Sequence, residues 1–380
     1  MRKINVLSLF DGVSCGRVAL QRAGIPVNKY YASEIDKYAI MITQNNFPDT
    51  VQLGDVTKWE DWDIDWSSID LLIGGSPCQG FSFAGKQLNF NDPRSKLFFD
   101  YVNILHHIQK YNPNVKFLVE NVKMKQEFQD IFSDMLGVQP IEINSALVSA
   151  QNRKRLYWTN WEFGQPEDKH IMLKDIVHEY SKVDRDKSLC LDANYYKGGN
   201  LKRYYEKHRR QLAFERLNKY IVPFDKTLQI LDKEVERGKV GYFGKDSQAN
   251  RVYYIHDKAV TLCGSAGGGA AKMGQYLFGC LTPDRVNKRQ NGQRFNEGDK
   301  FYTLTAQDKH GVLVEGYIRK LTPVECERLQ TLPDSFTANG IDPKTGKVVS
   351  ISNTQRYKAL GNGWTVDVIA HILKSLDFGE

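Results

Sequence analysis

Apolar and polar positions alternate in two different ways along the chain. Residues 1–160 carry short apolar runs separated by stretches of helical periodicity, which is the pattern of a doubly wound α/β domain. The apolar runs predict buried strands over Ile4–Phe10, Tyr30–Ser33, Leu71–Ile73 and Phe117–Val119. A glycine-containing turn and a helical stretch over Arg17–Ala23 follow the first strand. We therefore predict a mostly parallel sheet with helices between its strands.

The pattern changes twice after residue 160. From about 162 it breaks into short pieces rich in Gly and Tyr, and from about 316 helical periodicity returns over Pro323–Gln330 and Thr365–Leu376. We predict a catalytic α/β domain built from residues 1–161 and 316–380. Residues 162–315 are expected to form a smaller, irregular domain.

Composition excludes several classes of protein. No apolar run approaches the roughly 18–20 residues of a membrane helix, and the N-terminus lacks the apolar segment of a signal peptide. The six cysteines form no C-x-x-C pair and no zinc spacing, so we expect no metal and a reduced compartment. A cytoplasmic protein without a membrane partner is the expectation.

Positive charge is concentrated in the middle of the chain. Lys and Arg number 52 against 45 Asp and Glu, and the whole excess lies in 161–310, with 27 positive and 20 negative residues. The same segment holds 11 of the 19 tyrosines. Basic charge interleaved with aromatic rings indicates a surface for a polyanion. The densest stretch is 202–219, for which the alternative interpretation is a solvated helix face.

A glycine turn follows the first predicted strand, where α/β folds bind cofactors. Its sequence, Phe10-Asp11-Gly12-Val13-Ser14-Cys15-Gly16, is not the G-x-G-x-x-G of dinucleotide sites, so a cofactor without phosphates fits better. Glu34 ends the second strand, where an acid binds ribose hydroxyls, and Asp55-Val56 follows the next apolar piece. The alternative for each of these features is a purely structural turn.

A cysteine follows the third predicted strand in a loop bounded by glycine and proline, Gly74-Gly75-Ser76-Pro77-Cys78-Gln79-Gly80-Phe81-Ser82. A thiolate at such a position is accessible, although a lone loop cysteine can also be inert. The fourth strand ends in Glu120-Asn121-Val122, which places a carboxyl suitably for acid–base chemistry. Arg153 and Arg155 alternate into the apolar run 156–158, on one face of a predicted strand; their alternative role is phosphate attraction.

Taken in order, these motifs resemble the cytosine-5 DNA methyltransferase family. The resemblance rests on Phe-x-Gly, Pro-Cys-Gln, Glu-Asn-Val, Gln-x-Arg-x-Arg and the C-terminal 361–366, and covers the chain outside 162–310. The compact length resembles bacterial or phage enzymes. The Asp-Gly of the first motif, residues 147–150 and the Gly-x-x-Trp near the end resemble vertebrate de novo methyltransferases. Gly363-Trp364 departs from the Asn-Ser-Val of many bacterial members.

The resemblance implies an enzyme that uses S-adenosylmethionine to methylate carbon 5 of cytosine in duplex DNA. The implied fold is that of S-adenosylmethionine-dependent methyltransferases. Cys78 would be the covalent nucleophile, Glu120 would protonate ring N3, and Arg155, supported by Arg153, would bind the base's O2 and a phosphate. The flipped-out cytosine follows from the chemistry, because carbon 5 lies inside the duplex. The implied cofactor residues are Phe10, Asp11, Gly12, Val13, Ser14, Cys15, Glu34, Asp55, Val56, Pro77, Asn362 and Trp364.

The resemblance also makes the basic middle segment a target recognition domain that reads base edges. The stretch 79–96 is expected to close over the flipped base. The implied DNA-contacting residues are Gln79, Ser82, Lys86, Arg94, Lys202, Arg203, Arg209 and Arg210. A cognate restriction endonuclease is a candidate partner, and the expected location is the nucleoid of a bacterial or phage-infected cell.

Three rival functions are compatible with parts of the sequence. An RNA cytosine methyltransferase shares the motifs, and the large basic segment favours duplex DNA over it. A DNA-binding regulator on an inactive methyltransferase domain should lack Cys78, Glu120 or the glycine turn, and all three are present. A nicotinamide-dependent oxidoreductase is suggested only by the glycine turn, whose spacing argues against it.

Overall fold

The computed structural model describes residues 2–76, 93–178, 181–199, 204, 207–216, 228–235, 239–243, 251–253 and 316–378. The chain divides into two compact units. The first comprises Met1–Ile176, Arg185–Lys197 and Thr322–Glu380, and the second comprises Val177–Asp184 and Gly198–Leu321.

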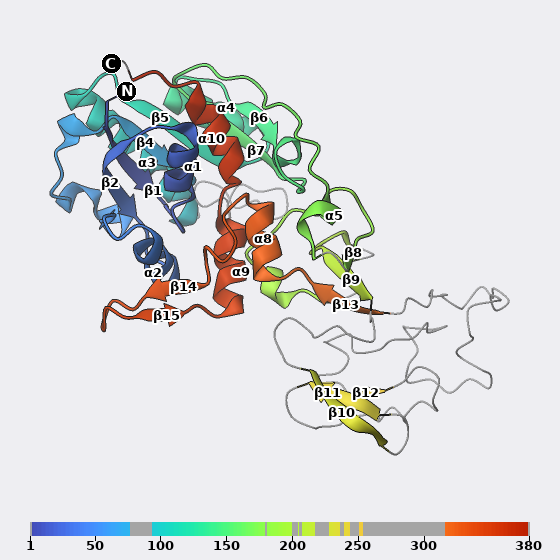
Figure 1. Ribbon diagram of the computed structural model, residues 1–380. Helices are drawn as coiled ribbons and strands as arrows, with labels where there is room; N and C mark the ends of the chain where they lie inside the picture. Colours follow the sequence, from blue (N-terminus) through green and yellow to red (C-terminus); the bar gives the residue numbers. More distant parts are fainter. Residues whose placement is uncertain are drawn as a thin grey trace. The chain divides into compact units, whose positions relative to one another are not determined.

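A seven-stranded, mostly parallel sheet forms the centre of the first unit (Figure 1). Strands β1 to β5 are parallel, whereas β7 runs antiparallel to both β5 and β6. The expected α/β fold is thus confirmed, with an antiparallel pair at one edge. In sheet order the strands are β3 (Val51–Gln52), β2 (Val27–Ser33), β1 (Ile4–Leu9), β4 (Leu71–Gly74), β5 (Lys116–Val122), β7 (Lys154–Thr159) and β6 (Ile141–Asn144).

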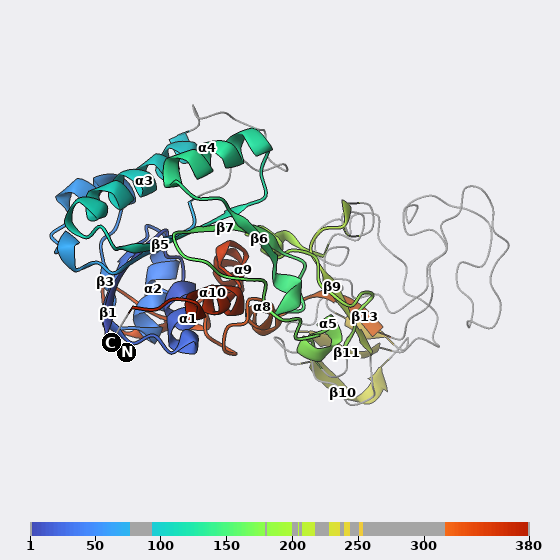
Figure 2. The same ribbon diagram turned by 90° about the horizontal axis from the view of Figure 1, so that it is seen from above.

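Helices cover both faces of this sheet (Figure 2). One face carries α3 (Pro93–Tyr111) and α4 (Gln126–Leu136), and the other carries α1 (Cys15–Ala23), α2 (Lys37–Asn46) and α10 (Val366–Lys374). All four residues of β4 are buried, as expected for a strand with helices on both sides. The order of the strands reverses between β1 and β4, and in such sheets ligands bind beyond the carboxyl ends of the strands at that point.

Aromatic side chains fill the layer between the sheet and α3 and α4. Phe98 of α3 stacks on Phe132 of α4, and Trp158 of β7 packs against Phe132 with ring centroids 5.3 Å apart. Two polar side chains in this layer find partners: the Trp158 indole donates to Ser133 Oγ, and the Tyr101 hydroxyl donates to the Leu72 and Leu118 carbonyls. This core holds β4 and β5 in register beneath the site described below.

The C-terminal part of the first unit packs back onto its N-terminal part. Helix α10 contacts α1, and Gly340 of β14 (Asn339–Ile341) approaches Met41 of α2 so closely that a side chain would not fit. A capping box formed by Thr322 and Glu325 starts α8. The remaining elements here are β15 (Val348–Ser350), α9 (Asn353–Asn362), α8 (Pro323–Leu329), α5 (Leu173–Ile176), and the 3₁₀ turns η1 (Val56–Asp61), η2 (Trp66–Ser68), η3 (Ser145–Leu147) and η4 (Tyr195–Lys197).

The second unit contains two three-stranded antiparallel sheets within its described residues. One orders β13 (Gly316–Lys320), β9 (Leu212–Arg216) and β8 (Ser181–Lys182), and the other β10 (Leu228–Val235), β11 (Lys239–Phe243) and β12 (Arg251–Tyr253). Strand β9 lies inside the basic stretch 202–219. The interpretation of that stretch as a helix face is therefore wrong for 212–216, where the backbone pairs with β13 and β8.

The limits of the two units differ from the boundaries at 162 and 315 predicted from periodicity. Residues 162–176 and 185–197 belong to the first unit. The Lys187 ammonium donates to the carbonyls of Ala146, Ser149 and Ile171, and the Gln151 side chain accepts from Leu191 N. These buried polar contacts give no apolar periodicity, so the pattern did not reveal them. Among the described helices, none combines the length and apolar character needed to cross a membrane.

Candidate active site

The turn between β1 and α1 has an unusual backbone. Phe10, Gly12 and Ser14 have φ angles of 56°, 61° and 58°, in the left-handed region. For Phe10 and Ser14 this conformation costs about 1–2 kcal/mol each, because Cβ approaches the following carbonyl. Such strain persists only where surrounding contacts impose it. The turn lies at the carboxyl end of β1, at the point where the strand order reverses.

Two carboxylates impose this backbone. Glu34 Oε2 accepts from Gly12 N at 2.8 Å, while its Oε1 accepts from the amides of Ile35 and Asp36. Asp11 accepts the Tyr30 hydroxyl at 2.7 Å and the Ser14 hydroxyl. Asp11 and Glu34, predicted as cofactor contacts, are thus engaged by protein groups that shape the turn.

Burial raises the pKa of Asp11 from its ordinary value of 3.8 to about 6, against hydrogen bonds from Ser14, Ser8 and Tyr30 that lower it. A raised folded-state pKa means that the folded protein binds the proton more tightly than the unfolded chain. The stabilisation from this group is therefore complete below about pH 4 and is lost as pH rises through about 6.

We expect Asp11→Asn to remove this pH dependence. Between pH 4 and pH 7 the free energy of unfolding of the wild type, relative to the variant, should fall by about 2 kcal/mol, from about 1.4 kcal/mol per unit of pKa shift, most of which falls in this range. Urea unfolding of both proteins across this range measures the difference. Asp49→Asn is the control, because Arg17 lowers the pKa of Asp49, so the stability that Asp49 contributes changes mainly below pH 4 and stays nearly constant from pH 4 to pH 7. A difference that does not change with pH would contradict the assignment.

The carboxylates around the turn suit a positively charged ligand with hydroxyl groups better than a negatively charged diphosphate. Asp11, Glu34 and Asp55 all lie at this edge of the sheet, and a Cβ on Gly12 would meet no atom of the described residues within 4 Å, so the turn is open to them on that side. Ile35, beside Glu34, is 75% exposed, and a large exposed apolar side chain at such a place suits a ligand's planar group. Ile35 was not predicted from the sequence, because one apolar residue after a strand carries no periodic signal.

Other residues predicted to bind the cofactor instead cap a helical turn or lie in the core. Asp55 caps η1 by accepting from Thr57 N at 3.0 Å, and Val56 is buried. Burial and the nearby Asp55 raise the pKa of Asp100 on α3. Asp100 was not predicted from the sequence as a residue of the site. Val13 and Cys15 are buried, and burial raises the pKa of the Cys15 thiol to about 12, so Cys15 stays protonated.

The catalytic candidate Glu120 is held at both carboxylate oxygens. Arg155 Nε lies 2.9 Å from Oε1, and the Trp364 indole Nε1 donates to Oε2 at 3.1 Å. Glu120 and Arg155 are brought together by the pairing of β5 with β7, whereas Trp364 arrives from the segment between α9 and α10. The side chain of Glu120 is 11% exposed and that of Arg155 15%, so little water competes for these contacts.

The chain that follows β4 passes directly beside Glu120. A Cβ on Gly75 would lie 2.8 Å from Glu120 Oε2, and the Asn121 side chain donates to Ser76 Oγ at 3.2 Å. The glycine and the asparagine of these motifs thus fix the position of residue 76, two residues before Cys78 in the sequence.

Arg153 occupies a different place from Arg155. Its guanidinium donates to the carbonyls of Gly363 at 2.9 Å, Leu191 at 3.0 Å and Gly361 at 3.4 Å, and the residue is 4% exposed. These contacts tie the C-terminal segment to β7 and to 185–197. Asn362, the last residue of α9, is exposed beside this segment.

Several predicted residues lie outside the described part of the chain. They are Pro77, Cys78, Gln79, Ser82, Lys86, Lys202 and Arg203. Arg94 belongs to α3 by its backbone, and its side chain is likewise outside the described part. In the second unit, Arg209 is exposed and Arg210 is partly buried.

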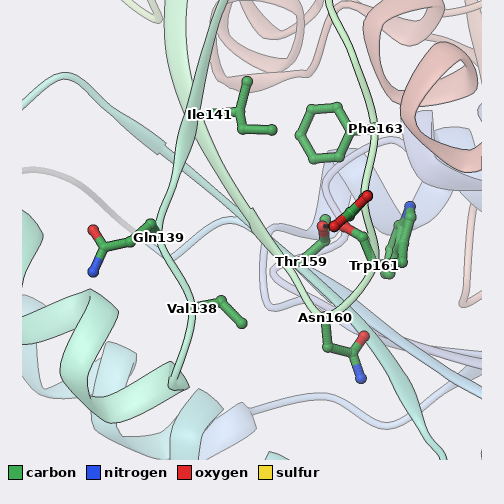
Figure 3. A pocket seen from close by; sticks show the side chains of 8 residues that line it. Val138, Gln139, Ile141, Thr159, Asn160, Trp161 and Phe163 are labelled. Carbon is green, nitrogen blue, oxygen red and sulfur yellow. Dashed lines mark hydrogen bonds between the residues drawn. The ribbon is translucent and has the colours of Figure 1, made fainter.

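A separate pocket of about 550 Å³ lies away from Glu120, at the other end of β7 (Figure 3). Thr159 and Asn160 line it beside the start of β5, since the Asn160 side chain bonds Phe117 N and Val115 O. Nothing in its lining carries a cluster of groups suited to catalysis.

Known proteins match this chain over nearly its whole length. The sequence model of the C-5 cytosine-specific DNA methylase family matches residues 4–377. The orphan methyltransferase M.SPRI of Bacillus phage SPR is 30% identical over 99% of this chain and 98% of its own. The type II methyltransferase M.HhaI of Haemophilus parahaemolyticus is 25% identical over 97% of this chain and 93% of its own.

Solved structures share the fold. The methyltransferase EhMeth of Entamoeba histolytica has a TM-score of 0.52 at 16% identity, covering 99% of this chain and 98% of its own. DNMT2 of Spodoptera frugiperda has a TM-score of 0.52 at 18% identity, covering 98% and 99%. This chain belongs to the C-5 cytosine-specific DNA methylase family and is a DNA (cytosine-5-)-methyltransferase.

Proposed function

We propose that this protein methylates carbon 5 of a flipped-out cytosine in duplex DNA, at a specific site, through a covalent bond to Cys78. The observation that carries the proposal is the carboxylate of Glu120, clamped between Arg155 and Trp364 and touching the chain that leads to Cys78. Two residues of chain span at most about 7 Å, so the nucleophile's place in the sequence suits attack on a base held by Glu120.

Carbon 5 of cytosine is a poor nucleophile, and covalent catalysis overcomes this difficulty. The Cys78 thiolate bonds to carbon 6, and the electron pair of the 5,6 double bond makes carbon 5 nucleophilic. S-adenosylmethionine supplies the electrophilic methyl group on a sulfonium. After carbon 5 has taken the methyl group, a base removes its proton and the bond between carbon 6 and sulfur breaks, which releases Cys78.

Glu120 and Arg155 act on the ring of the base. In its protonated form Glu120 donates its proton to N3, which offsets the negative charge that builds during thiolate attack, and it takes the proton back when the bond between carbon 6 and sulfur breaks. Arg155, already beside Glu120, binds the base's O2. Arg153 is proposed as a positioning residue rather than a base contact, because its donors serve the carbonyls of Leu191, Gly361 and Gly363.

The two acidic residues near the turn are proposed to have different roles toward the cofactor. Glu34 is proposed to bind the ribose hydroxyls while it holds Gly12, since each carboxylate oxygen has two lone-pair positions. Asp11 instead supports the turn through Tyr30 and Ser14. The carboxylate-rich edge favours the positive sulfonium of S-adenosylmethionine.

The test of the function is the incorporation of labelled methyl groups from S-adenosylmethionine into duplex oligonucleotides and into transfer RNA. The proposal expects transfer into DNA, on carbon 5 of cytosine, at a defined sequence found by bisulfite sequencing. Transfer into transfer RNA alone, or binding of a nicotinamide dinucleotide in place of S-adenosylmethionine, would overturn it.

The basic middle segment, 162–315, is proposed to be the target recognition domain. Its excess of positive charge supports this role, because phosphate contacts position a protein on DNA and base contacts specify the site. Exchange of this segment for that of a relative should change which cytosine is methylated. An exchange that leaves the methylated sequence the same would place recognition elsewhere.

Individual basic side chains of the segment should contribute by neutralising phosphates. Truncation of Arg209 and Arg210, together with Lys202 and Arg203, should weaken binding to all duplexes similarly. It should also reduce the log–log salt slope by roughly 0.9 for each phosphate that is no longer neutralised. Contacts from Gln79, Ser82, Lys86 and Arg94 to DNA stay proposals from the family resemblance.

The cellular setting is proposed from the relatives. M.SPRI is described as an orphan methyltransferase of a Bacillus phage and M.HhaI as a type II methyltransferase. We infer that the protein acts in the cytoplasm of a bacterial or phage-infected cell, and that methylation does not require a cognate restriction endonuclease.

A further inference from the structure

We propose that Trp364 is a positioning residue for the catalytic carboxylate, which it holds through its indole N–H. The proposal rests on the role assigned to Glu120 above. The indole Nε1 donates to Glu120 Oε2 at 3.1 Å, and the other oxygen, Oε1, faces Arg155 Nε at 2.9 Å. With one donor on each oxygen, the carboxylate is restrained against rotation about its last torsion.

Two glycines leave the space in which the indole lies. A Cβ on Gly75 would be 3.0 Å from Trp364 Nε1 and 2.8 Å from Glu120 Oε2. A Cβ on Gly16, in the first turn of α1, would be 3.4 Å from Trp364 Cζ3. The ring therefore sits between the end of β4 and the start of α1; a Cβ on Gly75 would crowd it, whereas a Cβ on Gly16 would only reach ordinary van der Waals distance from it.

The backbone on both sides of Trp364 is anchored by buried side chains. Arg153 and Gln330 both donate to the Gly363 carbonyl, at 2.9 and 3.2 Å. The Thr365 hydroxyl bonds Gln330 Oε1 and Ser145 Oγ. Because the backbone around Trp364 is fixed, its indole can hold the Glu120 carboxylate in one position. A ring on a mobile loop could not do this.

Trp364 also touches the turn that precedes α1. A backbone hydrogen bond from Trp364 to the Cys15 thiol lowers the pKa of that thiol, against the larger effect of burial. One residue thus contacts both the proposed cofactor turn and the acid that protonates the base. Trp364, from the C-terminal part of the chain, thus joins two groups that both come from its N-terminal third.

Trp364→Phe tests the role, because it keeps an aromatic ring and removes the N–H donor. We expect the single-turnover rate of methyl transfer to fall by about 10- to 100-fold, the size expected for loss of a hydrogen bond to a charged group. The affinity for S-adenosylmethionine, measured by calorimetry, should change little, because phenylalanine keeps an aromatic ring at a position that the family resemblance assigns to the cofactor. Trp161→Phe is the matched control, since its indole donates to the Ile372 carbonyl at 3.1 Å, outside the site.

A double-mutant cycle with Glu120→Gln separates positioning from general structural damage. If Trp364 acts through Glu120, adding Trp364→Phe to Glu120→Gln should cost little further rate, because the group being positioned is already altered. Fully additive losses, a wild-type rate in Trp364→Phe, or a loss confined to cofactor affinity would each overturn the proposal.

Two further measurements keep the outcome clear. If Trp364→Phe does not fold, Trp364→Leu removes the same N–H donor, and its rate should fall while the rate of the matched Trp161→Leu does not; equal rates would overturn the proposal. If the wild type and Trp161→Phe are both inactive on duplex DNA and on transfer RNA, the proposed function itself fails, which is a different result from an active Trp364→Phe.

Discussion

Cys78→Ala is expected to abolish methyl transfer to duplex DNA. The reaction needs a nucleophile at carbon 6, and neither alanine nor water at this position can make carbon 5 reactive enough to attack a methyl group. Binding of the duplex should be largely retained, because phosphate and base-edge contacts come from other residues. Single-turnover transfer of labelled methyl groups measures the first effect, and a mobility-shift titration measures the second.

The control for this variant is another cysteine. Cys190 is exposed and lies in the first unit, so Cys190→Ala tests whether loss of a thiol elsewhere matters. We expect Cys190→Ala to keep its activity. Methyl transfer by Cys78→Ala near the wild-type rate would rule out the covalent mechanism, whatever the behaviour of the control.

Glu120→Gln should show the second largest effect, a loss of about 10²–10⁴-fold in the single-turnover rate. Glutamine has nearly the same shape as glutamate but cannot deliver a proton to N3. It also loses the negative charge that faces Arg155 at 2.9 Å. The loss should appear in the rate of the chemical step and not in the affinity for S-adenosylmethionine.

Glu142→Gln is the matched control for the removal of an ion-paired glutamate. Glu142 on β6 pairs with Lys123 at 2.8 Å and Lys154 at 3.7 Å, on the surface. Surface pairs of this kind contribute at most about 1 kcal/mol, so this variant should transfer methyl groups at the wild-type rate. Equal rates for Glu120→Gln and Glu142→Gln would show that Glu120 is not the acid.

The local elements were predictable because their signals are local. The four expected strands appear as Ile4–Leu9, Val27–Ser33, Leu71–Gly74 and Lys116–Val122, with ends shifted by up to three residues. Fully buried apolar runs identify parallel strands well. Periodicity did not reveal β6 (Ile141–Asn144), a short edge strand in which only Ile143 is buried.

The site was predictable in its residues but not in its contacts. Glu120 and Arg155 were expected to cooperate, and the pairing of β5 with β7 places them 2.9 Å apart. The alternation of Arg153 and Arg155 placed both on one face of a predicted strand. It could not show that Arg153 bonds the Gly363 carbonyl while Arg155 pairs with Glu120. The bond from Trp364 to Glu120 spans 244 positions, and it forms through tertiary contacts such as the packing of α10 on α1 and the bonds of Arg153 and Gln330 to Gly363.

Buried polar contacts explain the remaining differences. Asp11 and Glu34 were expected to face a ligand, and in the structure their oxygens also satisfy Tyr30, Ser14 and Gly12. A sequence shows which acidic residue follows a strand, but the hydrogen-bond partners of that residue depend on the tertiary structure. The same holds for Lys187, whose three carbonyl contacts attach 185–197 to the first unit.

The most direct test of the covalent mechanism uses duplex DNA with 5-fluorocytosine at the target position, incubated with S-adenosylmethionine. Fluorine at carbon 5 cannot leave as a proton, so the enzyme should stay bonded to the methylated base through carbon 6. We predict a complex stable to denaturation, whose mass is that of protein plus methylated DNA and whose modified peptide contains Cys78. Absence of the complex with an enzyme that methylates ordinary cytosine, or its attachment to another residue, would contradict the covalent mechanism.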